Sequence, residues 1–339
     1  MIKDLIKNKH HQTMTPDYFK LESKINEIKD FSEKGLTGLH SCGLPALDEY
    51  WMIKLGYPLF IAGNPGAGKT EFCFEVLINC SILYGWKHFI YCGEGGNIEH
   101  IYYELLHKYL QKPYKFAEPK DQIQAEYFIS EHFVIANHDK DFTIDEFYEL
   151  VSKVESELGI KFQTTTFDPF NDIKEEVDKF GGREDKYLAY ALKQCRISSK
   201  KNNRMDILIN HVADVPFKID KDTGDSYLPP ALPTQWAGGR TWWRRAFVMI
   251  LVYKPYSWKK DANGRNFEEN EGHIIIQKYK PKGVGKKGQA SIFWDWKKNR
   301  YYCNVNGQDL YSCQKLEDFK PLQPSKDFTN SINDEQNVF

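Results

Sequence analysis

The chain has 339 residues, which is enough for one large domain or two small ones. Its 46 Lys and Arg against 47 Asp and Glu give a formal net charge of -1, which argues against a uniformly basic nucleic-acid binder. No apolar run approaches the roughly 20 residues that cross a bilayer, and the first residues lack the apolar segment of a secretory signal. The seven scattered cysteines contain no C-x-x-C pair, which argues against a structural zinc site and indicates a reducing, cytoplasmic location.

The charge is distributed unevenly along the chain. Residues 236–300 contain 15 Lys and Arg against 5 Asp and Glu, a net charge of +10. Residues 1–235 carry a net charge of -8, and the last 39 residues carry -3. A neutral chain with one strongly basic segment can still bind an acidic polymer through that segment.

The patterning divides the chain into three parts. Residues 1–35 are polar with spaced apolar positions, which predicts a helical extension that either packs on a neighbouring subunit or caps its own domain. Residues 36–314 alternate short apolar runs with helical stretches and are expected to form one domain. Residues 315–339 are polar with weak periodicity and are expected to form a flexible tail.

Within the central part, strands alternate with helices, which predicts an α/β fold with a mainly parallel sheet flanked by helices. Helices are expected over 70–85, 143–159 and 185–203, the second starting at a Thr143/Glu146 capping box. A β-hairpin is expected to end the domain at 290–303. The other strands are expected at 57–63, 88–94, 132–138, 162–170, 205–211, 245–254 and 272–280.

The strongest motif lies between the first of these strands and the helix that follows it. It matches the phosphate-loop (Walker A) pattern G-x-x-x-x-G-K-[ST] in full. Its glycines let backbone N–H groups turn toward phosphate oxygens, Lys69 can reach the β- and γ-phosphates, and the Thr70 hydroxyl can ligate Mg²⁺. The motif predicts binding of ATP with Mg²⁺ by Gly63, Asn64, Pro65, Gly66, Ala67, Gly68, Lys69 and Thr70.

Three polar residues at the ends of neighbouring strands are candidates for the remaining steps of ATP hydrolysis. Asp168 ends the strand 162–170 and is expected to organise the metal. Glu94 follows the strand 88–94 and is expected to polarise the attacking water. His211 ends the strand 205–211 and can sense the γ-phosphate and report its loss to the next loop.

The order of these features resembles a known family. Residues LTGLHSCGLPALDEY (36–50), the phosphate loop, Glu94, the DPFN stretch beginning at Asp168, and His211 follow one another as in the RecA-like ATPase core of DnaB/Twinkle-type hexameric replicative DNA helicases. The phage-encoded members are the most similar, and the resemblance covers residues 36–305. It implies a RecA-like fold, a homo-hexameric ring with ATP between subunits, and no primase domain within residues 1–35.

The resemblance also assigns residues outside the phosphate loop. The family usually has Lys-x-Arg on a strand that reaches the neighbouring subunit's ATP site, which places Lys278 and Lys280 there as catalytic groups acting in trans. Lys280 replaces the arginine and lacks its bidentate fork. Residues 238–255 resemble the loop and strand that face the central channel, so Arg240, Trp242, Arg244 and Arg245 are expected to contact single-stranded DNA. One of Trp242 and Trp243 is expected to be buried, and the sequence does not say which.

These features favour an ATP-dependent DNA helicase that translocates on single-stranded or forked DNA, with a separate primase or loader as a further partner and no membrane. If the protein is phage-encoded, its location is the host cytoplasm. The alternative is a RecA/KaiC-like recombinase or recombination mediator that forms a filament on single-stranded DNA. A third hypothesis is an ATP-dependent loader that binds a protein partner. The sequence leaves open the polarity, the nucleotide preference, the ring size and the choice between DNA and RNA.

Overall fold

The computed structural model describes residues 18–213, 215–305 and 307–312, which divide into two units between Thr37 and Gly38. The first unit contains a 3₁₀ turn, η1 (Leu21–Lys24), followed by helix α1 (Ile25–Lys34), neither of which has a buried residue. Helix α1 lies within the expected helical extension 1–35, and the apolar side chains described in this unit are exposed. These are Tyr18, Phe19, Leu21, Ile25, Ile28 and Phe31. The expected polar tail, 315–339, lies outside the described residues.

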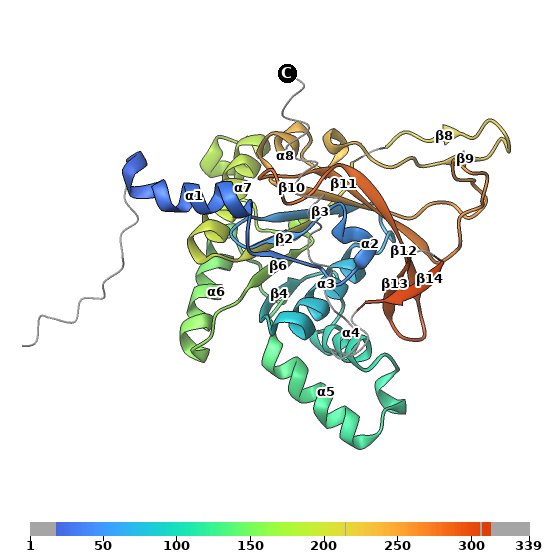
Figure 1. Ribbon diagram of the computed structural model, residues 1–339, viewed down its shortest axis with the longest axis horizontal. Coiled ribbons are helices and arrows are strands. Elements are labelled where there is room, and N and C mark those ends of the chain that lie inside the picture. The colour runs from blue at the N-terminus through green and yellow to red at the C-terminus, as the bar shows by residue number, and fades with distance from the viewer. Residues whose placement is uncertain (1–17, 214, 306, 313–339) are drawn as a thin grey trace, which may run out of the picture. The chain divides into compact units, whose positions relative to one another are not determined.

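The second unit is built on a ten-stranded sheet (Figure 1). Six strands are parallel and occur in the order β5 (Phe133–Ile135), β4 (His88–Cys92), β6 (Thr164–Asp168), β7 (Met205–His211), β3 (Leu59–Gly63) and β10 (Val248–Tyr253). The sheet continues antiparallel through β11 (Glu271–Lys278), β12 (Gly288–Asp295), β13 (Arg300–Val305) and β14 (Gln308–Tyr311).

Helices cover both faces of this sheet because its central strands are apolar on both sides. Along β3, Leu59 and Ile61 belong to one core cluster, whereas Phe60 and Ala62 belong to the other. The first cluster includes side chains of α2 (Pro45–Asp48), α3 (Lys69–Tyr84), α4 (Ile98–Leu110) and α5 (Pro119–His132). The second includes side chains of α6 (Ile144–Leu158), α7 (Glu184–Asn202) and α8 (Arg240–Arg245).

The predicted α/β fold with a C-terminal hairpin is confirmed, as is the capping box in which Thr143 Oγ1 accepts a hydrogen bond from the Glu146 N–H at 3.2 Å. The sequence reasoning did not predict helices α2, α4, α5 and α8, the edge strand β14, or the short elements between the long ones. The short elements are β1 (Leu39–His40), β2 (Ile53–Lys54), η2 (Tyr114–Phe116), η3 (Phe170–Asp172), η4 (Val177–Phe180), β8 (Lys218–Ile219), β9 (Ser226–Tyr227) and η5 (Pro233–Gln235).

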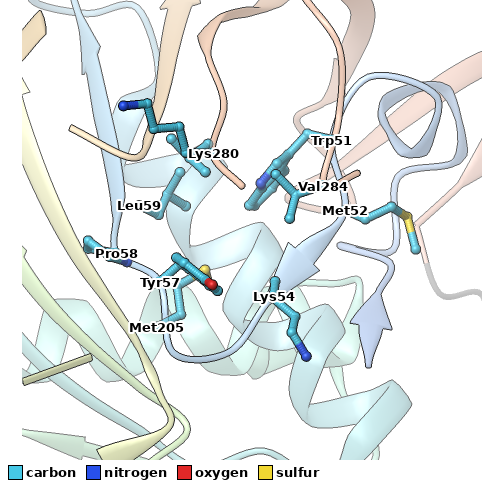
Figure 2. A pocket seen from close by; sticks show the side chains of 10 residues that line it. Trp51, Met52, Lys54, Tyr57, Pro58, Leu59, Met205, Lys280 and Val284 are labelled. Atoms are coloured by element: carbon cyan, nitrogen blue, oxygen red, sulfur yellow. The ribbon is translucent and has the colours of Figure 1, made fainter. Parts of the chain in front are cut away.

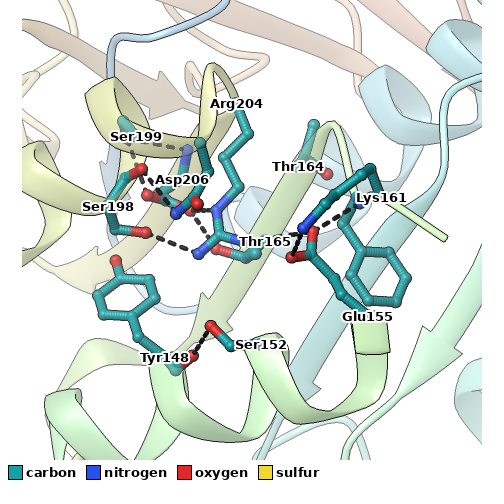
Figure 3. A network of polar contacts seen from close by, with 12 residues as sticks. Tyr148, Ser152, Glu155, Lys161, Thr164, Thr165, Ser198, Ser199, Arg204 and Asp206 are labelled. Atoms are coloured by element: carbon teal, nitrogen blue, oxygen red, sulfur yellow. Dashed lines mark hydrogen bonds and ion pairs between the residues drawn. The ribbon is translucent and has the colours of Figure 1, made fainter. Parts of the chain in front are cut away.

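A buried ion pair at the start of β7 is hydrogen-bonded to both α7 and β6 (Figure 3). Arg204 Nε donates to Asp206 Oδ1 at 2.8 Å, and both side chains are at most 1% exposed. Thr165 on β6 donates to the same carboxylate at 2.6 Å, and Ser199 on α7 donates to it at 2.9 Å. Because each carboxylate oxygen has a donor, the pair fixes α7 against β6 and β7 without leaving an unpaired carboxylate.

A second buried ion pair joins α3 to β13. Arg300 Nε donates to Glu75 Oε1 at 2.9 Å, and an Arg300 terminal nitrogen donates to Asn79 Oδ1 at 2.6 Å. Lys108 on α4 extends the network, with its ammonium 2.8 Å from Glu71 and 3.9 Å from Glu75. Since α3 begins at Lys69, this network fixes the helix that follows the phosphate loop.

Candidate functional site

The phosphate loop occupies the short connection between the end of β3 at Gly63 and the start of α3 at Lys69. Gly66 and Gly68 have φ of +72° and +86°, a conformation that side chains with a Cβ rarely adopt. A Cβ at Gly63 would overlap the carbonyl oxygen of Val252, and one at Gly68 would lie 2.8 Å from the Tyr301 hydroxyl. The glycines are therefore required by the local fold, and they place the N-terminus of a 16-residue helix behind the loop.

Lys69 folds back over this loop. Its ammonium donates to the carbonyl oxygen of Asn64 at 3.3 Å, and the residue is 8% exposed. Burial lowers the pKa of Lys69, while the carboxylates of Asp168 and Glu94 oppose that shift. Burial thus disfavours the charged form of Lys69. A bound anionic phosphate beside its ammonium would offset that cost.

Thr70 and Asp168 meet directly beside the loop. The Thr70 hydroxyl donates to Asp168 Oδ2 at 2.6 Å, and Asp168 is 2% exposed. Burial raises the pKa of Asp168 to about 6, against the opposing effects of the Thr70 hydrogen bond and the Lys69 charge. A hydroxyl and a carboxylate are the oxygen donors that Mg²⁺ prefers, so this pair fits a magnesium ion held next to a phosphate.

Glu94 and His211 form a second pair at the same end of the sheet. His211 Nε2 lies 3.4 Å from Glu94 Oε1, and the two side chains are 24% and 60% exposed. His211 is aligned with Gly63, the last residue of β3. The parallel strands end together, so the predicted residues from β3, α3, β4, β6 and β7 converge at one end of the sheet, called here the carboxyl end.

The sequence reasoning missed one acidic residue at this end. A Cβ at Gly93 would lie 2.5 Å from Asp172 Oδ2, so Asp172 packs against the backbone just before Glu94. Burial raises the pKa of Asp172, and the Glu94 charge adds to the shift. The only signal in the sequence was its position directly after the DPFN stretch, which does not by itself point to a site.

The backbone of His211 is joined to the segment before α8. The Ala237 N–H donates to the His211 carbonyl at 3.0 Å, and the side chain of Asn210 donates to the Ala237 carbonyl at 2.9 Å. Val212 and Trp236 also form an antiparallel bridge. A displacement of His211 would therefore be passed to residues 236–237.

Lys278 and Lys280 lie away from the phosphate loop of their own chain. Strand β11 is antiparallel to β10, and Lys278 is aligned with Met249, near the start of β10. Lys280 borders an apolar pocket that also includes Trp51, Leu59 and Val284, and its ammonium nitrogen points away from Trp51 and Val284 (Figure 2). This amino end of the sheet is separated from the loop by the five residues of β3, about 15 Å, so neither lysine reaches it.

The segment expected to form a DNA-contacting loop instead contains the short helix α8, and the assignment of Trp242 was wrong. Trp242 is fully buried, with its ring 5.3 Å from Phe60, 5.4 Å from Phe170 and 5.8 Å from Trp236, so no ring face is free to stack on a base. Trp243 is half-buried, which resolves the alternative left open by the sequence. The remaining expected contacts are exposed. They are Arg240, Arg244 and Arg245.

No family model and no curated protein sequence matches the chain. Solved structures do match. A solved ATPase domain aligns with a TM-score of 0.64 at 13% identity, covering 84% of this chain and 99% of that one. A DnaB-like replicative helicase, studied with its primase interactions, aligns with a TM-score of 0.63 at 14% identity, covering 84% and 67%. The RadB recombinase aligns at 15% identity, covering 76% and 97%, with a TM-score of 0.47 that is too low to bear on the fold.

The fold and the loop define the class of the protein as an α/β, RecA-like structure with a mainly parallel sheet. Its fold is similar to that of the solved ATPase domain and of the DnaB-like helicase, as the sequence resemblance implied. None of the helices within the described residues is both long and apolar enough to cross a membrane.

Proposed function

We propose that the protein is an ATP-dependent DNA helicase that forms a homo-hexameric ring. The observation that supports this most is the convergence of Lys69, Thr70, Asp168, Glu94 and His211 at the carboxyl end of the sheet. Five polar residues from four separate segments of the chain would not be expected to meet there without a shared ligand. A nucleoside triphosphate with Mg²⁺ fits the donors and acceptors that they present.

The position of each of these residues suits one step of ATP hydrolysis. The phosphate loop binds the ATP phosphates with its backbone N–H groups, and Lys69 exchanges the Asn64 carbonyl for the β- and γ-phosphates. Thr70 and Asp168 hold the Mg²⁺, which when bound neutralises charge on the phosphates. Glu94 orients the attacking water and accepts its proton.

His211 has a further role in this proposal. It pairs with Glu94 in the structure, and its backbone is joined to Ala237. When a γ-phosphate is present, His211 can donate to it and release Glu94 for the water. Loss of the γ-phosphate then reverses the exchange and shifts residues 236–237 toward α8.

The ring is needed to complete the site. Lys280 is exposed at the amino end of the sheet, where it cannot serve its own phosphate loop. In a head-to-tail ring, that end of one subunit can face the carboxyl end of the next, so that ATP lies between subunits and Lys280 neutralises charge on the transferred phosphoryl group.

The nucleic-acid surface is assigned to α8. Arg240, Arg244 and Arg245 neutralise phosphates of single-stranded DNA, and Trp243 replaces Trp242 as the candidate for stacking on a base. Movement of α8 with each hydrolysis would advance the strand and separate forked DNA. A separate primase or loader and a cytoplasmic location belong to the same proposal.

The test is ATP turnover with and without single-stranded DNA, followed by unwinding of a forked duplex, with Lys69→Ala as the inactive control. We expect turnover that rises with single-stranded DNA and unwinding that requires it. Strand annealing on an open filament without unwinding would favour the recombinase instead. Turnover that does not change on adding single-stranded DNA would contradict both DNA-based functions and favour the loader.

A further inference from the structure

The end of strand β11 holds the segment that leads into α8. Gln277 accepts a hydrogen bond from the indole N–H of Trp236 at 3.0 Å and donates one to the carbonyl of Ala231 at 2.6 Å. The next residue, Lys278, donates to the carbonyl of Trp243, and its ammonium lies 5.2 Å from the centre of the Trp243 ring. Two consecutive residues of β11 therefore bind three points of the 231–243 segment.

The same segment is bound on its other side by the γ-phosphate sensor. The Ala237 N–H donates to the His211 carbonyl at 3.0 Å, and the Ala213 N–H donates to the Gln235 carbonyl at 2.6 Å. Trp236 lies between these contacts and is fully buried. It thus bridges His211 at one end of the sheet and Gln277 near the other.

The chemistry of the Gln277 amide makes this contact sensitive to movement of Trp236. The buried indole N–H has Gln277 as its acceptor, so a shift of Trp236 either carries Gln277 with it or leaves a buried donor unpaired. An unpaired buried donor costs about 1–3 kcal/mol. Moving Gln277 together with Trp236 avoids that cost and displaces the end of β11. Lys280 follows Gln277 by three residues and therefore moves with it.

We propose that Gln277 is a positioning residue that links the sensor His211 of one ATP site to Lys280, which acts at the neighbouring site. This inference rests on the proposed function, because it requires a ring in which Lys280 works in trans. In this proposal, the hydrogen bond between Trp236 and Gln277 links hydrolysis at one ATP site to the position of Lys280 at the next. A change of nucleotide state at His211 moves Trp236, and Gln277 converts that movement into a change in the position of Lys280.

The first measurement is steady-state ATP turnover by the full chain with saturating single-stranded DNA. Gln277→Leu removes the acceptor and the donor at nearly constant volume. We expect kcat to fall about tenfold while KM for ATP stays within twofold, because Gln277 acts on a group that stabilises the transition state and not on ATP itself. The matched control is Gln289→Leu, the same change at an exposed position on the adjacent strand β12, which should leave both constants unchanged.

The deciding measurement is a double-mutant cycle with Lys280→Ala. If Gln277 acts through Lys280, the double variant turns over no more slowly than Lys280→Ala alone. Effects that multiply would overturn the inference, because they would mean that Gln277 contributes by another route. If Gln277→Leu does not fold, Gln277→Met serves in the same cycle, since it keeps the length of the side chain and removes both the acceptor for the Trp236 indole and the donor to Ala231.

The two proposals fail in different ways. A wild-type protein without DNA-stimulated ATP turnover contradicts the proposed function and this inference with it. A wild-type protein that is active and is slowed by Lys280→Ala, but in which the two substitutions multiply or Gln277→Leu has no effect, contradicts the inference alone.

Discussion

The two ends of the parallel sheet are organised differently. At the carboxyl end, the polar side chains contact one another within the chain. Thr70 is hydrogen-bonded to Asp168, and His211 lies beside Glu94. At the amino end, Lys280 is exposed beside an apolar pocket and does not reach the phosphate loop of its own chain. In the proposed ring, one end is the binding half of the site and the other is complementary to it.

The distribution of charge follows the same division. At the amino end, α8 and residues 278–287 hold eight Lys and Arg and no Asp or Glu. The carboxyl end instead gathers Glu94, Asp168 and Asp172. Opposite charges at opposite ends favour head-to-tail association, which is the arrangement that a ring requires.

The largest effect is expected at the carboxyl end. Glu94→Gln should lower kcat for ATP hydrolysis by roughly 10²–10⁴-fold, because an amide cannot accept the proton of the attacking water. Binding of ATP should be retained, since the phosphate loop is untouched. Glu99→Gln, a surface glutamate of α4, is the control and should have full activity. Normal turnover in Glu94→Gln would remove Glu94 from the catalytic residues.

The second prediction concerns the stability of the nucleotide-free protein. Burial raises the pKa of Asp168 from 3.8 to about 6, so the folded protein binds this proton more tightly than the unfolded chain. The free energy of unfolding should therefore fall as pH rises from about 4 to about 6, with a full cost of about 3 kcal/mol at neutral pH. Asp168→Asn keeps an oxygen acceptor for Thr70 and should remove that cost, while it abolishes Mg²⁺-dependent hydrolysis.

Urea unfolding at pH 4 and pH 7.5 in the presence of a chelator measures this effect. Asp168→Asn should be more stable than wild type at pH 7.5 and equal to it at pH 4. An equal difference at both pH values would mean that the Asp168 carboxyl does not titrate in this range.

The third prediction tests the amino end. Lys280→Ala should lower kcat about 10²-fold, less than the roughly 10³–10⁵-fold that an arginine contributes in such a position. Lys280→Arg should raise kcat above wild type, because the guanidinium can bind two phosphoryl oxygens. Lys282→Ala, an exposed lysine two residues later, should behave as wild type.

Mixing two inactive variants distinguishes action in trans from action in cis. A ring assembled from Glu94→Gln and Lys280→Ala subunits contains some interfaces with an intact Glu94 on one side and an intact Lys280 on the other. Turnover of the mixture should exceed that of either variant alone. A mixture as inactive as its components would contradict a role for Lys280 at the neighbouring site.

The smallest effect is expected at the nucleic-acid surface. Replacing both Arg244 and Arg245 by alanine should reduce the slope of log affinity against log salt for single-stranded DNA by about 1.4, since each lost phosphate contact accounts for about 0.7. Arg196→Ala, an exposed arginine on α7, should leave the slope unchanged. An unchanged slope in the double variant would place the DNA surface elsewhere.

The carboxyl end could be predicted from the sequence because its residues follow two local rules. A phosphate-loop motif between a strand and a helix has a fixed geometry, and polar residues that end neighbouring parallel strands meet at one end of the sheet. Glu94, Asp168 and His211 were found in this way. Asp172 was missed because its approach to Gly93 depends on how the chain turns after β6.

The amino end was less predictable for a physical reason. Trp242 and Trp243 are adjacent in a short helix, and only packing against Phe60 and Phe170 decides which indole is buried. The contact of Lys278 with Trp243 joins residues 35 positions apart and depends on the register of β10 and β11. Local sequence patterns specify neither the packing partners of a side chain nor the register between two strands.

The buried pair between Arg300 and Glu75 has a mechanical consequence. Removing one partner of such a pair costs about 3–5 kcal/mol, so the pair holds α3 and the C-terminal hairpin together as one rigid body. The phosphate loop at the start of α3 is therefore the stationary part of the subunit. In the proposed function, motion produced by hydrolysis is therefore taken up on the opposite face of the sheet, where hydrogen bonds such as that between Trp236 and Gln277 hold residues 231–243.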